Sequence, residues 1–283
     1  MMRAAIVVNG YYSSESYRYQ TARLQEELEK AGVSCTLFYT DTPTDTDSAF
    51  DFDFALFTDK DVTLAKLMEA KGVRLFNCAD CIENTDSKGK TAAVLSGDAS
   101  IRQQKTIFRP KRYKYERDEL FLRQVGSKLG YPLIAKESRG SLGEQVYLIR
   151  KEEELFRIDE KMGLKEGVYQ AYRAGSEGKS IRVIVVGGKA VGAMLLESEG
   201  DFRSNAHQGG KGTPVRGKEE WLTVAERVAK RLQADYVGVD LFYDEPVVIE
   251  ANGNAFFEEF EQKTGINVAE TYIKYSIRSM NNE

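Results

Sequence analysis

Residues 235–261, DYVGVDLFYDEPVVIEANGNAFFEEFE, place two apolar segments on either side of an acidic turn. Residues 236–243 and 247–251 each have the length and composition of a short strand. The turn at Asp244-Glu245 is followed by Pro246, and proline is tolerated where a strand begins. The sequence therefore predicts an antiparallel hairpin in which Asp240 lies opposite or next to Glu250.

This hairpin would gather two carboxylates and an amide. Glu250 and Asn252 are two residues apart, so they share one face of a strand. Like charges that face each other across a sheet are destabilising unless a cation lies between them. Mg²⁺ uses few protein carboxylates and fills its shell with waters and phosphate oxygens. Asp240, Glu250 and Asn252 are thus a candidate metal site, and a solvated polar strand face is the alternative.

The composition is that of an ordinary soluble protein. The chain has 283 residues, of which 42% are hydrophobic and 30% charged, and its formal net charge is -4. We expect one large domain or two to three small ones. No basic excess indicates nucleic acid as a partner, and no apolar run approaches the ~18 residues of a membrane span. We expect a cytoplasmic protein, because the N-terminal MMRAAIVVNG fits a first strand better than a signal peptide. The sequence does not distinguish a monomer from a homo-oligomer.

Cysteine and histidine argue against several classes of site. Cys35, Cys78 and Cys81 do not make a disulfide framework, and the C-x-x-C pair at 78–81 has no second pair to complete a zinc site. We expect a structural or incidental pair there rather than a redox or metal site. The one histidine, His207, has no nucleophile-elbow motif to support a Ser-His-Asp or Cys-His mechanism. The basic run at 109–114, RPKRYK, is expected to be a solvated loop.

Strands and helices alternate over about the first 80 residues. Expected strands are 3–9, 33–39, 52–57 and 73–77, and expected helices are 15–30 and 62–71. This alternation predicts a parallel sheet covered on both faces. No G-x-G-x-x-G motif supports a dinucleotide site. Asn9, Gly10 and Tyr11 follow the first strand, at the edge where ligands bind in open α/β sheets, although an ordinary turn is the alternative.

The rest of the chain has a mixed α+β pattern. Expected helices are 87–95, 117–129, 152–161, 219–232 and 268–277. Expected strands are 106–108, 131–136, 145–149, 167–172 and a hairpin of 181–186 with 189–196. Residues 201–215 are polar and Gly-rich, and we expect a loop there.

A Gly/Ser-rich turn, SRGSLG at 138–143, separates two of these strands. Backbone N–H groups of such turns can bind phosphates, and an ordinary hairpin turn is the alternative. Lys136 ends the apolar strand before it. A partly buried lysine there suits phosphate charge, although a lysine that extends to solvent is equally compatible.

Further cations are candidates for the same site. Arg182 lies in the apolar segment IRVIVV, and Arg203 and Asn205 lie in DFRSNAHQGG. Arginine binds phosphate or carboxylate through a planar fork, and a surface salt bridge is the alternative. With Lys88 and Lys136, these arginines would balance the charge of Asp240 and Glu250. That balance is typical of a nucleotide–Mg²⁺ site.

The order of these motifs resembles the ATP-grasp superfamily, and most closely its glutamate-ligase-like branch, which includes the ligases that modify ribosomal protein S6. The resemblance covers about residues 73–275. The matching segments are SKGKTAAVL, YPLIAKESRGSLGEQVYLI, YQAY, SIRVIVVGGKAVGAM, DFRSNAHQGG, VGVDLF, VIEANGN and EQKTGINVAE. Each segment is weak alone, and the eight in order are specific.

The resemblance implies an α/β fold with an N-terminal parallel-sheet domain at 1–85 and an ATP-grasp domain at 86–283. Two α+β lobes, at about 100–172 and 173–283, would hold ATP between them. Residues implied to bind ATP are Lys88, Lys136, Gly140, Ser141, Gly143, Gln170 and Tyr172. Arg182, Arg203 and Asn205 would lie near the γ-phosphate and the acyl group, and Asp240, Glu250 and Asn252 would bind Mg²⁺ or Mn²⁺.

The implied activity is ATP-dependent carboxylate–amine ligation through an acyl phosphate. The substrates would be a small-molecule or peptide carboxylate and an amine such as an amino acid. A small-molecule kinase and a regulatory nucleotide-binding protein are the alternatives. The chain departs from the family pattern at Ser180, at Leu195 and at 252–256, where N-G-N-A-F replaces N-x-S-P-G. The last departure lies where the acceptor is expected to bind.

Overall fold

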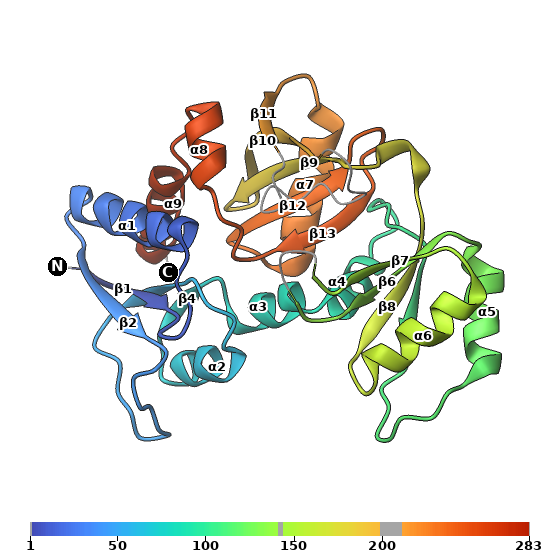
Figure 1. The fold of residues 1–283 in the computed structure, drawn as a ribbon. Coiled ribbons are helices and arrows are strands. Elements are labelled where there is room, and N and C mark those ends of the chain that lie inside the picture. The colour runs from blue at the N-terminus through green and yellow to red at the C-terminus, as the bar shows by residue number, and fades with distance from the viewer. Residues whose placement is uncertain (1, 141–143, 199–210, 283) are drawn as a thin grey trace.

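The strands form three separate sheets in the computed structural model, which describes residues 2–140, 144–198 and 211–282. Figure 1 shows the N-terminal sheet at the left, a five-stranded sheet in the centre and a third sheet at the right. Among the described residues, no helix is both long and apolar enough to cross a membrane.

The first sheet is parallel, with the order β2-β1-β3-β4. Its strands are β1 (Arg3–Val8), β2 (Ser34–Tyr39), β3 (Phe54–Phe57) and β4 (Arg74–Phe76). Helix α1 (Glu15–Lys30) packs on the face that carries Ile6, and α2 (Val62–Ala70) on the face that carries Val7. Because both faces are covered, β1 is a continuous apolar run. The predicted parallel sheet is confirmed.

The central sheet is antiparallel, with the order β11-β10-β9-β12-β13. Its strands are β9 (Lys179–Val186), β10 (Lys189–Glu197), β11 (Lys211–Val215), β12 (Tyr236–Phe242) and β13 (Val248–Asn252). Helix α7 (Glu219–Leu232) buries one face. The loop expected at 201–215 is wrong for 211–215, because those residues pair with β10. The sequence KGTPV is a poor strand former, but an edge strand tolerates Pro214.

The other face of the central sheet is divided. At one end Ile184 and Tyr236 belong to the same apolar cluster as α1, α8 (Glu258–Thr264) and α9 (Val268–Asn282). Figure 1 shows α8 and α9 beside α1 and the first sheet. The C-terminal helices therefore join the central sheet to the first one, and the remaining end of this face is left to line a cleft.

The third sheet has the order β5-β8-β6-β7, and all of its pairs are antiparallel. Its strands are β5 (Thr106–Arg109), β6 (Leu133–Glu137), β7 (Val146–Ile149) and β8 (Gly167–Ala171). Helices α5 (Glu119–Leu129) and α6 (Glu152–Met162) cover one face. Arg109 is buried, and its Nε donates to Asp159 at 2.7 Å. The expectation of a solvated loop is therefore wrong at Arg109, which an internal carboxylate holds in the core.

Two short helices, α3 (Ala79–Asp86) and α4 (Lys88–Leu95), connect the first sheet to the third (Figure 1). Helix α3 was not predicted. The Cys78 sulfur accepts a hydrogen bond from the Cys81 N–H at 3.4 Å, so the C-x-x-C pair caps this helix. A 3₁₀ turn, Ala174–Ser176, leads from β8 to β9.

Asn77 fixes the first sheet to the hairpin of β12 and β13. Its Nδ2 donates to the carbonyls of Tyr236 at 2.7 Å and Gly253 at 2.9 Å. Its Oδ1 accepts from the N–H groups of Asp235 and Tyr236. Since Asn77 is buried and fully hydrogen-bonded, the carboxyl edge of the first sheet has a defined position beside the hairpin.

Candidate active site

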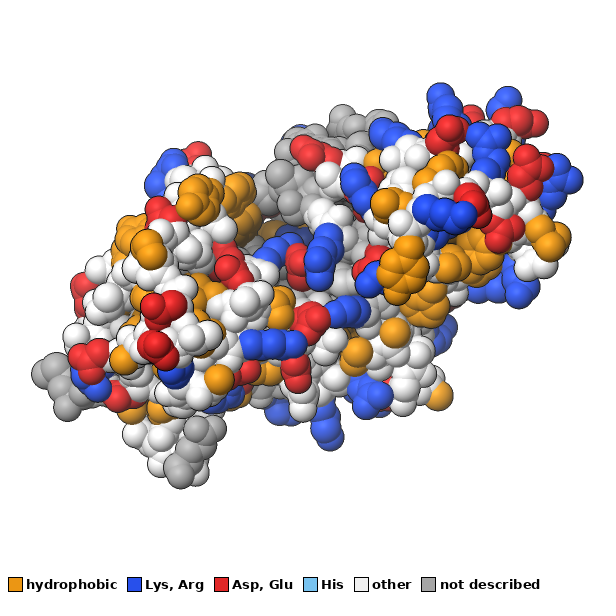
Figure 2. Space-filling view, turned by 90° about the horizontal axis from the view of Figure 1, so that it is seen from below, with side chains coloured by type: hydrophobic (Ala, Val, Ile, Leu, Met, Phe, Trp, Pro, Cys, Tyr) orange, Lys and Arg blue, Asp and Glu red, His pale blue; other side chains and the backbone are white. Residues whose placement is uncertain are grey.

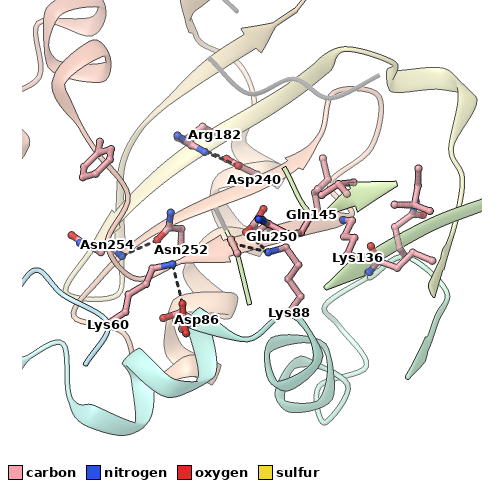
Figure 3. Close-up of a pocket in the computed structure, with 18 of the residues that line it drawn as sticks. Lys60, Asp86, Lys88, Lys136, Gln145, Arg182, Asp240, Glu250, Asn252 and Asn254 are labelled. Atoms are coloured by element: carbon pink, nitrogen blue, oxygen red, sulfur yellow. Dashed lines mark hydrogen bonds and ion pairs between the residues drawn. The ribbon is translucent and has the colours of Figure 1, made fainter. Parts of the chain in front are cut away.

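Three charged residues lie in register across the central sheet. Asp240 on β12 is opposite Glu250 on β13, as predicted, and opposite Arg182 on β9. Residues in register on neighbouring strands project to the same face. The row Arg182–Asp240–Glu250 therefore lines the part of the sheet that α8 and α9 leave uncovered (Figure 3).

Arg182 and Asp240 form a bidentate ion pair. The guanidinium Nε and Nη2 donate to the two carboxylate oxygens at 2.8 and 2.7 Å. Burial alone would lower the pKa of Arg182, but Asp240 outweighs it and the pKa is raised. The sequence predicts Arg182 as one of the cations that balance Asp240 and Glu250, and the structure pairs it directly with Asp240.

Glu250 is surrounded by cations from three elements. Lys88, the first residue of α4, places its Nζ 3.5 Å from Glu250. Burial would raise the pKa of Glu250, but Lys88, Lys136 and Arg182 outweigh it and the pKa is lowered. The carboxylate is therefore ionised at neutral pH.

The residues fit a hard divalent cation. Asp240 and Glu250 supply carboxylate oxygens, and the Asn252 Oδ1, which accepts from the Asn254 N–H at 3.0 Å, has a second lone pair. Within the described ranges, no three Asp, Glu, His or Cys residues cluster as a closed metal site. A cation bound here would need the amide, waters and ligand oxygens, which is the manner of Mg²⁺.

The third sheet supplies the opposite wall. Lys136 on β6 and Gln170 on β8 line the cavity, and Gln170 Nε2 donates to the Thr106 hydroxyl at 3.0 Å. The Gly140 carbonyl accepts from Lys88 Nζ at 3.2 Å. The Tyr172 hydroxyl bonds Glu177, and burial followed by that contact raises its pKa to about 12. Desolvation lowers the pKa of Lys136 to about 8, although the charge of Glu250 opposes this.

These walls enclose a cavity of about 390 Å³. Figure 2 shows lysine, arginine and acidic side chains gathered around the hollow in the middle of one face of the molecule. The structure brings together these predicted residues: Lys88, Lys136, Gly140, Gln170, Tyr172, Arg182, Asp240, Glu250 and Asn252. The predicted residues Ser141, Gly143, Arg203 and Asn205 lie outside the described residues.

One end of the cavity combines residues that the sequence identified with others that it did not. Asn9 and, from the segment 252–256 where the acceptor is expected to bind, Asn254 and Phe256 were identified, whereas Tyr12, Tyr17, Asp59 and Lys60 were not. Asn9 donates to Asp59 at 2.7 Å, and both follow strands of the first sheet. Their position at the carboxyl edge of parallel strands was the available signal. Two other residues singled out in the sequence do not line the cavity. Tyr11 is 86% exposed. Leu195 packs on the face of the central sheet that α7 covers.

The comparisons agree with this architecture. A family model described as a RimK-like ATP-grasp domain matches residues 85–276. The chain is 34% identical over 207 residues to the "Uncharacterized protein MG012 homolog" of Mycoplasma pneumoniae, covering 70% of this chain and 71% of that protein. It is 31% identical over 234 residues to human N-acetylaspartylglutamate synthase A, covering 80% of this chain and 58% of that protein.

A solved structure has the same fold. The D-alanine–D-alanine ligase of Bacillus anthracis complexed with ATP superposes with a TM-score of 0.74 at 18% identity, covering 100% of this chain and 99% of that one. The predicted fold class is confirmed. Because the family model covers more than half of the chain and the functionally named relatives are synthases and ligases, this protein is an enzyme of the RimK-like ATP-grasp family of carboxylate–amine ligases.

Proposed function

We propose that this enzyme joins a carboxylate to an amine through an acyl phosphate, at the expense of ATP. The observation that carries the proposal is the row Arg182–Asp240–Glu250, which lies at the centre of a cavity walled by all three sheets. We divide the chain at about residue 85, with the ATP-grasp unit after it and α8 and α9 returning to the first sheet.

The nucleotide would lie between the third sheet and the central one. Apolar side chains on the cavity wall suit a purine ring, and they are Ile134, Val146, Phe242 and Ile249. Gln170 and Tyr172 would border that ring, and Lys88 and Lys136 would bind phosphates. Asp240, Glu250 and Asn252 would hold Mg²⁺, or Mn²⁺ in its place, which supplies positive charge to the phosphate oxygens when bound.

The reaction would proceed in two steps, phosphorylation of the carboxylate and then attack by the amine. A substrate carboxylate is phosphorylated by ATP at one of its oxygens, which yields an acyl phosphate and ADP. An amine then attacks the acyl carbon, the C–O bond to phosphate breaks, and an amide, phosphate and a proton are released. Placement and fixed charge are what these side chains would contribute, with Arg182 beside the transferring group.

The test is to incubate the enzyme with ATP, Mg²⁺ and pools of carboxylates and amines. The pools would contain citrate, N-acetyl-L-aspartate, short peptides and the L-amino acids. Mass spectrometry should find a product lighter by one water than the sum of two inputs, together with ADP. A kinase would release ADP and a phosphorylated product without an amine, and a regulatory protein would release no ADP with any pool.

Lys136 gives a prediction about pH. Because its pKa is about 8 in the free protein, a growing fraction loses its proton as the pH rises from 7 to 9. ATP affinity should therefore fall above pH 8, by at most about tenfold per pH unit, and binding there should take up a proton. Calorimetry in buffers of different ionisation enthalpy measures both effects.

The control is Lys136→Arg, which stays charged and should bind ATP with no such fall. An equal pH dependence in both proteins would assign the effect to another group. The stability of the folded protein should change with pH in the opposite direction to ATP affinity. The lowered pKa of Lys136 destabilises the folded state below about pH 8, where the desolvated side chain is charged. That cost should fade as the pH rises toward 10.5, where the unfolded chain also loses the proton.

A further inference from the structure

The end of the cavity next to the first sheet contains one unexplained cation. Among the described residues that precede Asp86, Lys60 is the one cationic side chain on the cavity wall. It lies three residues after β3, at the carboxyl edge of the parallel sheet. Side chains at this edge are well placed to contact ligands in open α/β sheets.

The side chain of Lys60 points from the first sheet toward the C-terminal end of β13. Figure 3 shows it extended toward Asn252, on the other side of Glu250 from Lys136. Its Nζ lies 2.9 Å from an Asp86 oxygen, and its side chain is 45% exposed. It lines both the large cavity and a small neighbouring one that also includes Asn252 and Asn254.

The two arginines on the described cavity wall each make several hydrogen bonds to an internal carboxylate. Arg182 makes two to Asp240 and Arg173 makes three to Asp244. Lys60 has one ion pair, and a lysine ammonium has three donors. It can keep its contact with Asp86 while it donates to a ligand.

An anionic substrate at this end of the cavity needs a cation. The carboxylate to be phosphorylated must approach the γ-phosphate from the side away from ADP, which is the side of the first sheet if Lys136 binds the nucleotide. Asp59 and Asp86 line that end and would repel it. Without a compensating positive charge, the substrate carboxylate and the γ-phosphate would lie close to the side chains of Asp59 and Asp86.

We propose that Lys60 binds a carboxylate group of the acyl substrate, with Asp86 holding the ammonium in place. The substrate class is a small carboxylate or peptide that reaches past Asn252 to the first sheet. There it would meet the rings of Tyr12 and Phe256 and the amides of Asn9 and Asn254. This inference rests on the proposed ligase function, and it adds a specificity-determining residue from outside the ATP-grasp unit.

The experiment uses the carboxylate that elicits ADP release from the wild-type enzyme in the pools of citrate, N-acetyl-L-aspartate and short peptides. Lys60→Met should raise the KM for that carboxylate about 10- to 100-fold, because a charged hydrogen bond is lost. The KM for ATP should change by less than about threefold. Lys60→Arg should recover most of the carboxylate affinity.

Two further variants separate substrate binding from a structural role. Lys66 also pairs with a carboxylate on α3, Glu83 at 3.0 Å, but it does not line the cavity, so Lys66→Met should behave as wild type. Asp86→Asn breaks the Lys60 ion pair and keeps the cation. Its carboxylate KM should stay well below that of Lys60→Met.

Three results would overturn the inference. An unchanged carboxylate KM in Lys60→Met would remove Lys60 from the substrate site and leave the ligase function standing. Equal defects in Lys60→Met and Asp86→Asn, with a lower unfolding temperature in both, would make the ion pair a structural link. If no carboxylate elicits ADP release from the wild-type enzyme, both the ligase proposal and this inference fail.

Discussion

Asp240→Asn and Glu250→Gln are each expected to lower the rate of ADP release at least ~100-fold. Each change removes one negative charge from the row that would hold the divalent cation, while it keeps the size of the side chain. Glu250→Gln should also leave Lys88 and Lys136 with less compensating charge, because Glu250 is the anion that both of them face. Weaker metal binding and poorer phosphoryl transfer should therefore appear together.

The measurement is ADP release at saturating ATP over a range of Mg²⁺ concentrations. Glu245→Gln is the matched control, since Glu245 lies at the turn of the same hairpin, pairs with Arg102 and Arg173, and does not line the cavity. It should retain normal turnover. Near-normal turnover of both Asp240→Asn and Glu250→Gln at saturating Mg²⁺ would refute the metal site.

The hairpin could be predicted because its information is local. Apolar residues on both sides of a short acidic turn determine that the two strands pair and that Asp240 lies opposite or next to Glu250. A register shift between Asp240 and Leu241 then brings Asp240 opposite Glu250. Helix α7 begins and ends at the predicted residues for the same kind of reason, since its apolar positions recur with helical spacing.

The contacts that define the candidate site are long-range, and no local pattern encodes them. Arg182 and Asp240 are 58 residues apart in sequence, and they meet because β9 and β12 are neighbours. The strand order of a sheet depends on the packing of the whole domain. Lys60 and the burial of Arg109 could not be predicted for the same reason, although the position of Asn9 after a parallel strand did indicate that the first sheet contributes to a site.

Arg182→Met is expected to destabilise the metal-free enzyme by about 3 kcal/mol, because it leaves the Asp240 carboxylate without its cation in a site where that side chain is only 12% exposed. Arg173→Met is the control. It breaks a more exposed ion pair, with Asp244, whose side chains are 26% and 33% exposed, and should cost less than about 1 kcal/mol. Urea denaturation in the presence of EDTA measures both values.

The cause of the loss can be separated from a simple packing defect. In the double variant Arg182→Met with Asp240→Leu, no unpaired charge remains, so the double variant should be more stable than Arg182→Met alone. Mg²⁺ with ADP should restore part of the stability of Arg182→Met, since a divalent cation beside Asp240 would replace the missing charge. The gain should be smaller for the double variant, in which the nucleotide can still bind but the Asp240 carboxylate is missing.

Arg182→Met alone should lower turnover at least ~100-fold at saturating ATP, because Arg182 would stabilise charge on the phosphoryl group in transfer as well as orient Asp240. Restored stability with little restored turnover in Mg²⁺ and ADP would show that the metal replaces the charge of Arg182 but not its position. If Mg²⁺ with ADP leaves the stability of Arg182→Met unchanged, and the double variant is no more stable, Asp240 has no metal-binding role and Arg182 is a packing residue.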